Sequence, residues 1–382
     1  MKWKVTLSDL NFDQRERKMV DRVIKSRWLT MGETVERLEG EFADFMGAKH
    51  AIAVSSGTAA LHLAMRVLNI NPADEVIVPS LNFVASSNAI LYVGAKPVFV
   101  DISSLNDFNL SCEDLKKKIT PKIKAIVVVH YGGYLADMEE IKKIARKHRL
   151  FVIEDSAHAI GADLGSNMAG TLGEIGCFSF FSNKNLATGE GGMIVTDDDR
   201  LARRVKLLRS HGMTSMTLNR HKGHAYTYDV VELGYNYRMT EISAVLGILQ
   251  LKKLSQTNKK RKVLTDLYVS NLKETFGLSI PFKDYPRKSS YHLFPILLDK
   301  KVNRKKFMEL LKKEGIQSSI HYPPIHKFSY YQRNLKESQT KLPLTEYAGA
   351  HEVTLPLHPL LEKEDVVFVC KKIKKILPQV LR

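Results

Sequence analysis

Three short segments carry residues that could hold a phosphate, a ring nitrogen and an aldehyde. The first, residues 55–64, reads SSGTAALHLA and joins a predicted strand to a predicted helix. Gly57 would allow close backbone approach, and Ser56 and Thr58 would add hydroxyls to the free N–H groups of the helix N-terminus. The segment suits one phosphate, although it lacks the glycine pattern of a P-loop or a dinucleotide site. A capped helix start without a ligand explains it equally well.

The second segment, residues 150–158, ends a predicted strand in a carboxylate. It reads LFVIEDSAH, with Asp155 at the strand end and His158 three residues later. A carboxylate buried at this place needs a positive partner, and a protonated heterocyclic nitrogen would supply one. A helix cap or an ion pair would satisfy Asp155 as well.

The third segment, residues 178–192, reads FSFFSNKNLATGEGG and holds Lys184 in a polar, glycine-rich loop. Burial in a cleft would lower the pKa of this lysine and free its amine for reaction with an aldehyde. Taken alone, Lys184 fits a solvated surface lysine. Pyridoxal phosphate needs a phosphate cradle, a carboxylate on its pyridine nitrogen and an amine for its aldehyde. Together the three segments therefore predict a pyridoxal phosphate enzyme.

Strand and helix patterns alternate through the first two-thirds of the chain. Apolar runs predict strands at 51–54, 75–78, 97–101, 125–130 and 150–154, and helical periodicity predicts helices at 58–67, 84–92, 112–118 and 138–148. This alternation is typical of an α/β fold with a mostly parallel sheet between helices, which binds ligands at the carboxyl ends of its strands.

The remaining third has a different pattern. One long amphipathic helix is predicted from 240 to about 272, then a strand at 294–298, a helix at 303–314, a closing helix from about 364, and loops at 285–290 and 322–334. We expect a large cofactor-binding domain that includes the N-terminal segment, residues 1–245. A smaller α+β domain, residues 246–382, would be entered by the long helix.

Composition excludes several classes of protein. The 382 residues are 44% hydrophobic and 26% charged, which fits two globular domains and excludes disordered, collagen-like and coiled-coil proteins. The net charge is +17, but the basic runs lie at helical spacing without interleaved aromatic residues. An anionic small substrate is therefore favoured over nucleic acid. No apolar run could span a bilayer and the three cysteines are scattered, so we expect no membrane association and a cytoplasmic location.

The sequence resembles the DegT/DnrJ-type sugar aminotransferases, which belong to fold type I (aspartate aminotransferase-like) of the pyridoxal phosphate enzymes. The resemblance covers nearly the whole chain and is carried by seven ordered segments: SRWLTMGETVERLEGEF (26–42), SSGTAALHLA (55–64), DEVIVPSLNFVASSNAILYVGAKPVFVDI (74–102), EDSAHAIGA (154–162), FSFFSNKNLATGEGG (178–192), LGYNYRMTEISAVLGILQL (233–251) and LPLHP (355–359). It implies the fold-type I architecture of a large domain and a smaller C-terminal domain.

The resemblance also implies catalytic roles. Lys184 matches the lysine that forms the internal aldimine with the cofactor and then moves the proton. Asp155 matches the carboxylate on the pyridine nitrogen, His158 the Gln or His beside the ring hydroxyl, and Phe83 the aromatic residue stacked on the ring.

Phosphate positions of the family match Thr58, Ala59 and Ser179, next to Gly57. Asn236 matches a residue that reaches the phosphate from the neighbouring subunit. The resemblance therefore implies a homodimer in which each site is built by two chains.

Substrate positions are implied for Trp28, Thr30, Arg238, His321 and Tyr322. The last two lie in the segment HYPPIH, which lacks the carboxylates or further histidines of a metal site, and we predict no metal. The chain departs from the family pattern at Asn82, where Thr is usual, and at Arg27, where Gly is common beside Trp28.

These matches imply an aminotransferase that moves an amino group from glutamate to a nucleotide-linked keto-deoxysugar, with pyridoxamine phosphate between the two half-reactions, in deoxyamino-sugar and polysaccharide biosynthesis. A cyclitol or a free keto sugar is an alternative acceptor. Related sugar 3-dehydratases carry His in place of Lys184, which argues against dehydration. A non-catalytic regulatory or nucleic-acid-binding protein would be expected to have lost Lys184 or Asp155, and both are present.

Overall fold

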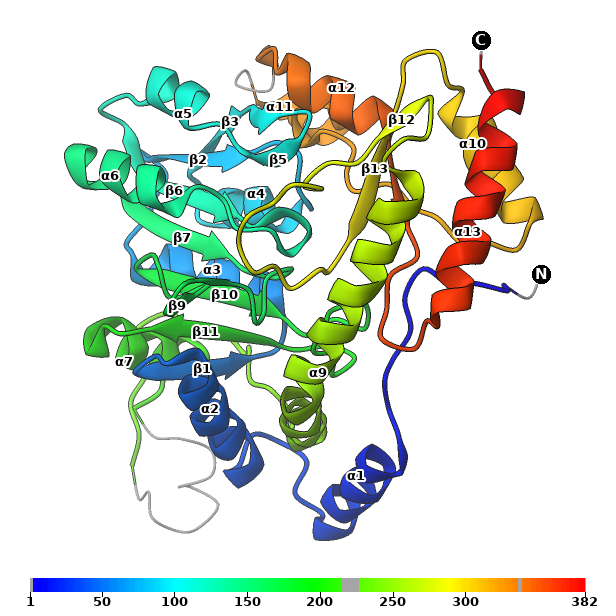
Figure 1. Ribbon diagram of the computed structural model, residues 1–382. Coiled ribbons are helices and arrows are strands. Elements are labelled where there is room, and N and C mark those ends of the chain that lie inside the picture. The colour runs from blue at the N-terminus through cyan, green and yellow to red at the C-terminus, as the bar shows by residue number, and fades with distance from the viewer. Residues whose placement is uncertain (1–2, 215–226, 336–338, 382) are drawn as a thin grey trace.

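A seven-stranded, mostly parallel sheet forms the centre of the larger part of the chain (Figure 1). The computed structural model describes residues 3–214, 227–335 and 339–381. Along the sheet the strand order is β1-β11-β10-β7-β6-β2-β3, and only β11 runs antiparallel to its neighbours. The strands are β1 (His50–Val54), β2 (Glu75–Pro79), β3 (Lys96–Val100), β6 (Ile123–Val129), β7 (Phe151–Asp155), β10 (Ile175–Ser179) and β11 (Gly192–Thr196).

Helices cover both faces of this sheet because its strands are apolar on both sides. One face packs against α3 (Gly57–Val67), α4 (Ala85–Tyr92) and α7 (Asp199–Leu208). The other packs against α2 (Glu33–Met46), α5 (Cys112–Lys118), α6 (Met138–His148) and the first half of α9 (Glu241–Leu272). The helix α1 (Gln14–Ser26) lies against α9. Short hairpins are formed by β4 (Ile102–Ser104) with β5 (Asp107–Leu110) and by β8 (Asp163–Leu164) with β9 (Asn167–Met168).

A second core surrounds a small antiparallel sheet in the C-terminal part. The sheet has the order β12 (Leu278–Ser279), β13 (Phe294–Leu298), β14 (Glu352–Leu355). Around it lie the second half of α9, α10 (Arg304–Lys313) and α13 (Lys363–Ile376), with α11 (Ser329–Asn334) and α12 (Pro343–His351) returning toward the large sheet. Within the described ranges, 3₁₀ turns are formed by η1 (Tyr131–Gly133), η2 (Ile325–Lys327) and η4 (Leu377–Gln379).

The long helix α9 joins the two cores. Its side chains from Ala244 to Leu254 pack with α2, whereas Leu264, Tyr268 and Leu272 belong to the C-terminal core. Thr240 caps the helix by accepting a hydrogen bond from the N–H of Ser243. We propose that the division between the two domains, expected at 245/246, lies in this helix.

The predicted α/β class is confirmed, and the predicted strands of the large sheet lie within two residues of the observed ones. The helices predicted at 112–118 and 138–148 coincide with α5 and α6. The loop predicted at 322–334 is wrong in part because it contains η2 and α11. Six residues are too few to show a helical period, and α11 is held instead by Tyr331, which is buried against Phe99.

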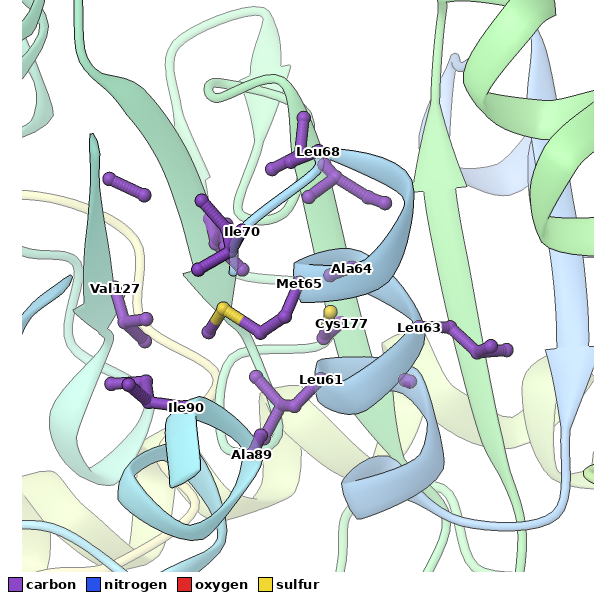
Figure 2. Close-up of a cluster of buried hydrophobic side chains, with 14 of the residues drawn as sticks. Leu61, Leu63, Ala64, Met65, Leu68, Ile70, Ala89, Ile90, Val127 and Cys177 are labelled. Atoms are coloured by element: carbon purple, nitrogen blue, oxygen red, sulfur yellow. The ribbon is translucent and has the colours of Figure 1, made fainter. Parts of the chain in front are cut away.

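Helix α3 contains most of the predicted phosphate segment, residues 55–64, and packs on the sheet. Figure 2 shows its apolar side chains between the sheet and α4, with Met65 extending toward Val127 of β6 and Ile90 of α4. All three side chains are fully buried. Close packing of this kind fixes where the N-terminus of α3 points.

We expect Met65→Ala to lower the free energy of unfolding by about 2–5 kcal/mol, because it removes buried methylenes and leaves a cavity. Denaturant titration followed by circular dichroism would measure the change. The matched control is Ile24→Ala on the exposed side of α1, with an expected effect within about 0.5 kcal/mol. Equal effects of the two substitutions would contradict the packing described for α3.

Candidate active site

A cavity of about 390 Å³ lies at the carboxyl ends of the strands of the large sheet. Residues that follow or end β1, β2, β6, β7 and β10 line it, as expected for a parallel sheet. One further wall comes from His321 and Tyr322 of the C-terminal part. The predicted site residues that it brings together are Gly57, Thr58, Phe83, Asp155, His158, Ser179, Lys184, His321 and Tyr322. A larger cleft, of about 940 Å³ between α9 and residues 280–291, contains none of them.

The carboxylate of Asp155 is buried at the end of β7 and is held by two donors. The hydroxyl of Ser86 donates to Oδ2, and the N–H of Ala157 donates to Oδ1 at 3.2 Å. Asn82 supports this arrangement because its amide donates to the Ser86 hydroxyl at 2.9 Å. Asp155 is thus fixed with one side toward the cavity.

The neighbouring carboxylate, Glu154, points to the opposite face of β7. It lies 2.9 Å from the ring of His130 and accepts hydrogen bonds from three backbone N–H groups of residues 170–173. The alternation of side chains along a strand therefore separates the two carboxylates. Glu154 joins His130 and residues 170–173 to β7 and so has a structural role. Of the two carboxylates, only Asp155 faces the cavity.

Lys184 is half-buried in the loop after β10 and lines the cavity. Burial lowers the pKa of its amine from 10.5 to about 8, and the negative charge of Asp155 opposes this shift. Desolvation disfavours the ammonium form, so about a tenth of the side chain is a neutral amine at pH 7 and about half at pH 8. The site can therefore offer Lys184 as a nucleophile and as a proton carrier.

The first turn of α3 meets the end of β10 at very close range. A Cβ atom on Gly57 would lie 2.8 Å from the Cβ of Ser179, so only glycine fits without displacement. The N–H groups of Gly57 and Thr58, the first residues of α3, have no intrahelical acceptor. The N–H of Ala59 donates to the Ser56 hydroxyl at 3.0 Å, so in this conformation it serves the helix cap.

The imidazole of His158 is packed between two rings. It stacks on His292 with centroids 4.4 Å apart, and its Nε2 lies 3.1 Å from the hydroxyl of Tyr322. Burial, assisted by the charge of Lys184, holds the pKa of His158 well below 6.5. Its Nδ1 is buried and has no hydrogen-bond partner within the described part of the chain. A neutral imidazole with one open nitrogen therefore stands beside Lys184.

Comparison with known proteins decides the family. The model of the DegT/DnrJ/EryC1/StrS aminotransferase family matches residues 11–374. The chain is a member of this family. The GDP-perosamine synthase of Escherichia coli O157:H7 is 36% identical over 362 residues, which cover 94% of this chain and 95% of that protein.

Solved structures agree with this assignment. PseC of Helicobacter pylori, an aminotransferase of pseudoaminic acid biosynthesis, superposes with a TM-score of 0.93 at 32% identity, covering 99% of this chain and all of that one. DesV of S. venezuelae, solved with a ketimine intermediate, gives 0.88 at 31% identity, covering 96% and 95%. The chain is therefore a pyridoxal phosphate-dependent sugar aminotransferase with the fold of type I.

The cavity of this sugar aminotransferase fits its cofactor. Gly57, Thr58 and Ser179 form a cradle of N–H and O–H donors into which a Cβ could not be placed, as a phosphate requires. Asp155 could hold a ring nitrogen protonated, and the open Nδ1 of His158 could bond a ring hydroxyl. When bound, the cofactor would supply the aldehyde and the electron sink.

Five of the predicted residues do not line the cavity of this chain, and one of them is Ala59, whose N–H is bonded to Ser56. Trp28 and Thr30 lie between α1 and α2, while Asn236 and Arg238 lie in the segment before α9. Asn236 is exposed, as a residue directed to a second chain would be. The roles of these five residues stay predictions.

Several residues of the site were missed from the sequence. Ser86 and His292 touch Asp155 and His158, and Asn185 bonds Nδ1 of His292 at 3.0 Å. Ser86 lies in the first turn of α4, four residues after Asn82, and nothing in the local sequence marks it. Nothing local marks His292, because it reaches the site through tertiary packing.

The second histidine of HYPPIH, His326, points away from the cavity. Its Nδ1 bonds the hydroxyl of Ser80 at 2.7 Å and its Nε2 lies 3.2 Å from Glu346. Within residues 3–214, 227–335 and 339–381, no three His, Cys, Asp or Glu side chains gather as a metal site. No helix in the described ranges is long and apolar enough to cross a membrane.

We expect Lys184 to react as an amine with a titration midpoint near pH 8. Competitive labelling of the cofactor-free enzyme with trace acetic anhydride, read by peptide mass spectrometry across pH, would measure it. Asp155→Asn should lower the midpoint further, because the charge of Asp155 raises the pKa of Lys184. Lys116 is the internal control, since its hydrogen bond to Glu140 raises its pKa above 10.5. Equal midpoints for both lysines would contradict the burial of Lys184.

Proposed function

We propose that this enzyme transfers an amino group from glutamate to a nucleotide-linked keto-deoxysugar. The observation that carries the proposal is the cavity in which Lys184, with its lowered pKa, and a fixed Asp155 face His321 and Tyr322. Similarity to a GDP-perosamine synthase supports a nucleotide-linked acceptor. The net charge of +17 favours an anionic substrate.

The residues of this chain divide the work of such a reaction. Asp155, held by Ser86, would keep the ring nitrogen of the cofactor protonated and so favour withdrawal of electrons from the substrate. The neutral amine of Lys184 would accept a proton from the donor's α-carbon and return one to the sugar carbon in the second half-reaction. Burial of the cavity excludes water that would otherwise compete for these protons.

The sugar would enter over the rim formed by His321 and Tyr322. The ring of Tyr322 lies 6.0 Å from that of Phe83, which is 56% exposed above the cavity. We propose that Trp28, Thr30 and Arg238 contribute further contacts to the sugar nucleotide. These three residues do not line the cavity, so they would contact the part of the substrate that extends beyond it. The aromatic rings of the rim would suit the base of a nucleoside diphosphate, and Arg238 would suit its phosphates.

A homodimer would complete the site. Large apolar side chains are exposed in the segment that carries Asn236 and around the cavity mouth: Leu29, Phe83, Phe181, Tyr228, Val230, Val231 and Leu233. Leu233 is 75% exposed, which an isolated chain would not favour. We propose that a second copy covers this surface and that its Asn236 reaches the phosphate cradle.

Glutamate is expected to bleach the visible absorbance of the enzyme loaded with pyridoxal phosphate and to yield an equal amount of 2-oxoglutarate. Lys184→Ala should lower the rate by at least about 10²-fold, because it removes the proton carrier. A panel of keto-sugar nucleotides, with mass-spectrometric detection of the aminated product, would then identify the acceptor. A loaded enzyme that neither bleaches with glutamate nor aminates any sugar nucleotide would refute the proposal.

The shared site predicts complementation between two inactive variants. Lys184→Ala removes the amine, and Asn236→Asp places a negative charge beside the phosphate of the partner's site. In a mixed dimer, one site receives both intact residues, so a refolded equimolar mixture should recover about a quarter of the sites. A mixture as inactive as its components would show that each chain builds its site alone.

A further inference from the structure

Three buried side chains form a hydrogen-bonded row that leads from the cavity into the small sheet. Nδ1 of His321 lies 2.8 Å from the hydroxyl of Thr354, and that hydroxyl also bonds Oε1 of Glu352. The other oxygen of Glu352, Oε2, accepts the backbone N–H of His321 at 2.7 Å. Thr354 and Glu352 lie on β14 and do not line the cavity.

His321 is the member of the row that faces the cavity. Its carbonyl accepts a hydrogen bond from the hydroxyl of Tyr131, and the backbones of Ser319 and Thr354 are bonded to each other in both directions, at 2.9 and 3.2 Å. These contacts fix the ring. Within the described part of the chain, Nε2 of His321 makes no hydrogen bond, so that nitrogen is left for whatever enters the cavity.

The row couples the protonation of Glu352 to the tautomer of His321. If Glu352 is ionised, the single hydroxyl hydrogen of Thr354 goes to Oε1, so Thr354 must accept Nδ1–H of His321, and Nε2 is bare. If Glu352 is neutral, its proton lies on Oε1, because Oε2 is occupied by the backbone N–H. Thr354 then donates to Nδ1, and Nε2 carries the hydrogen.

The surroundings of Glu352 let it take either form. Burial raises the pKa of its carboxyl to about 8, although the hydrogen bonds from Thr354 and from the backbone of His321, and the charge of Arg304, oppose the shift. Arg304 itself donates to the carbonyls of Gly349 and Glu352. The phenols of Tyr131 and Tyr322 are the other titratable groups near this carboxyl, and burial raises the pKa of both. On the cavity side, burial and Lys184 lower the pKa of His321 to about 4, so its ring stays neutral.

We propose that Thr354 and Glu352 form a proton relay behind His321, through which the cavity takes a proton from, or gives one to, the amino group that is transferred. His321 would be the catalytic residue, and Thr354 and Glu352 would be positioning residues that act through it. The identity of the amine rests on the proposed function. The coupling between Glu352 and His321 does not.

The step conserves atoms and charge. The incoming ammonium gives a proton to the bare Nε2 of His321, while Nδ1–H passes to Thr354 and the hydroxyl hydrogen of Thr354 passes to Glu352. An ammonium and a carboxylate become an amine and a carboxylic acid, and His321 changes tautomer without gaining charge. The reverse sequence would protonate the product amine before it leaves.

Nitrogen-15 NMR of histidine-labelled holoenzyme would test the coupling without any substrate. His321 is expected to change from the Nε2–H form at pH about 6 to the Nδ1–H form at pH about 10, with its midpoint near that of Glu352. Thr354→Val should abolish this change and Thr354→Ser should restore it. Thr345→Val, at a buried threonine of α12 whose hydroxyl bonds no described residue, is the matched control and should keep it. An unchanged tautomer in the wild type would overturn the relay.

Glu352→Gln provides a second variant in case Thr354→Val does not fold, and it should hold one tautomer across the whole range. Kinetics give an independent measurement. Because Lys184 also titrates near pH 8, the comparison is made at one pH above 8, where Thr354→Val should slow amine transfer by about 10- to 100-fold and Thr354→Ser should recover most of it. Equal rates for wild type and Thr354→Val would overturn the relay, whereas a wild type without amine transfer would refute only the proposed function.

Discussion

The burial of a carboxylate and an amine in one cavity is the constraint on which this structure depends. Burial that lowers the pKa of Lys184 from 10.5 to about 8 costs the folded state about 3 kcal/mol while the amine is protonated. The sign follows from linkage: the cost is full below pH 8 and disappears as the pH rises toward 10.5. Packing of the sheet, whose strand ends converge on the cavity, offsets this cost. The hydrogen-bond donors that hold Asp155 contribute as well.

The second core is needed because the large sheet cannot close the cavity by itself. His321 and Tyr322 come from the C-terminal part, and their position depends on β14 and on Tyr131 of the large domain. Next to the reactive lysine, Asn185 bonds both Asn258 of α9 and Ser290, and so ties the Lys184 loop to the helix that crosses between the cores. Packing far from the cavity therefore controls the geometry within it.

Local pattern was enough to predict the elements that carry strong periodicity and the residues that follow them. Helices such as α5 and α6, the position of Asp155 at the end of a strand and that of Lys184 in a polar loop follow from period and polarity alone. Resemblance to the family added the roles of those residues. Ser86, His292 and Glu352 could not be found in this way, because each acts through a side chain that is distant in sequence and adjacent only in the folded chain.

Burial also explains why three histidines can surround a lysine. His158, His292 and His321 all have pKa values lowered mainly by burial, and Lys184 lowers each of them further. The influence is mutual, so neutral rings avoid adding positive charge beside the lysine. A neutral imidazole can still accept or donate a proton, whereas an imidazolium can only donate. The cavity thus keeps its groups able to move protons in both directions, as a reaction that first accepts and then returns an amino group requires.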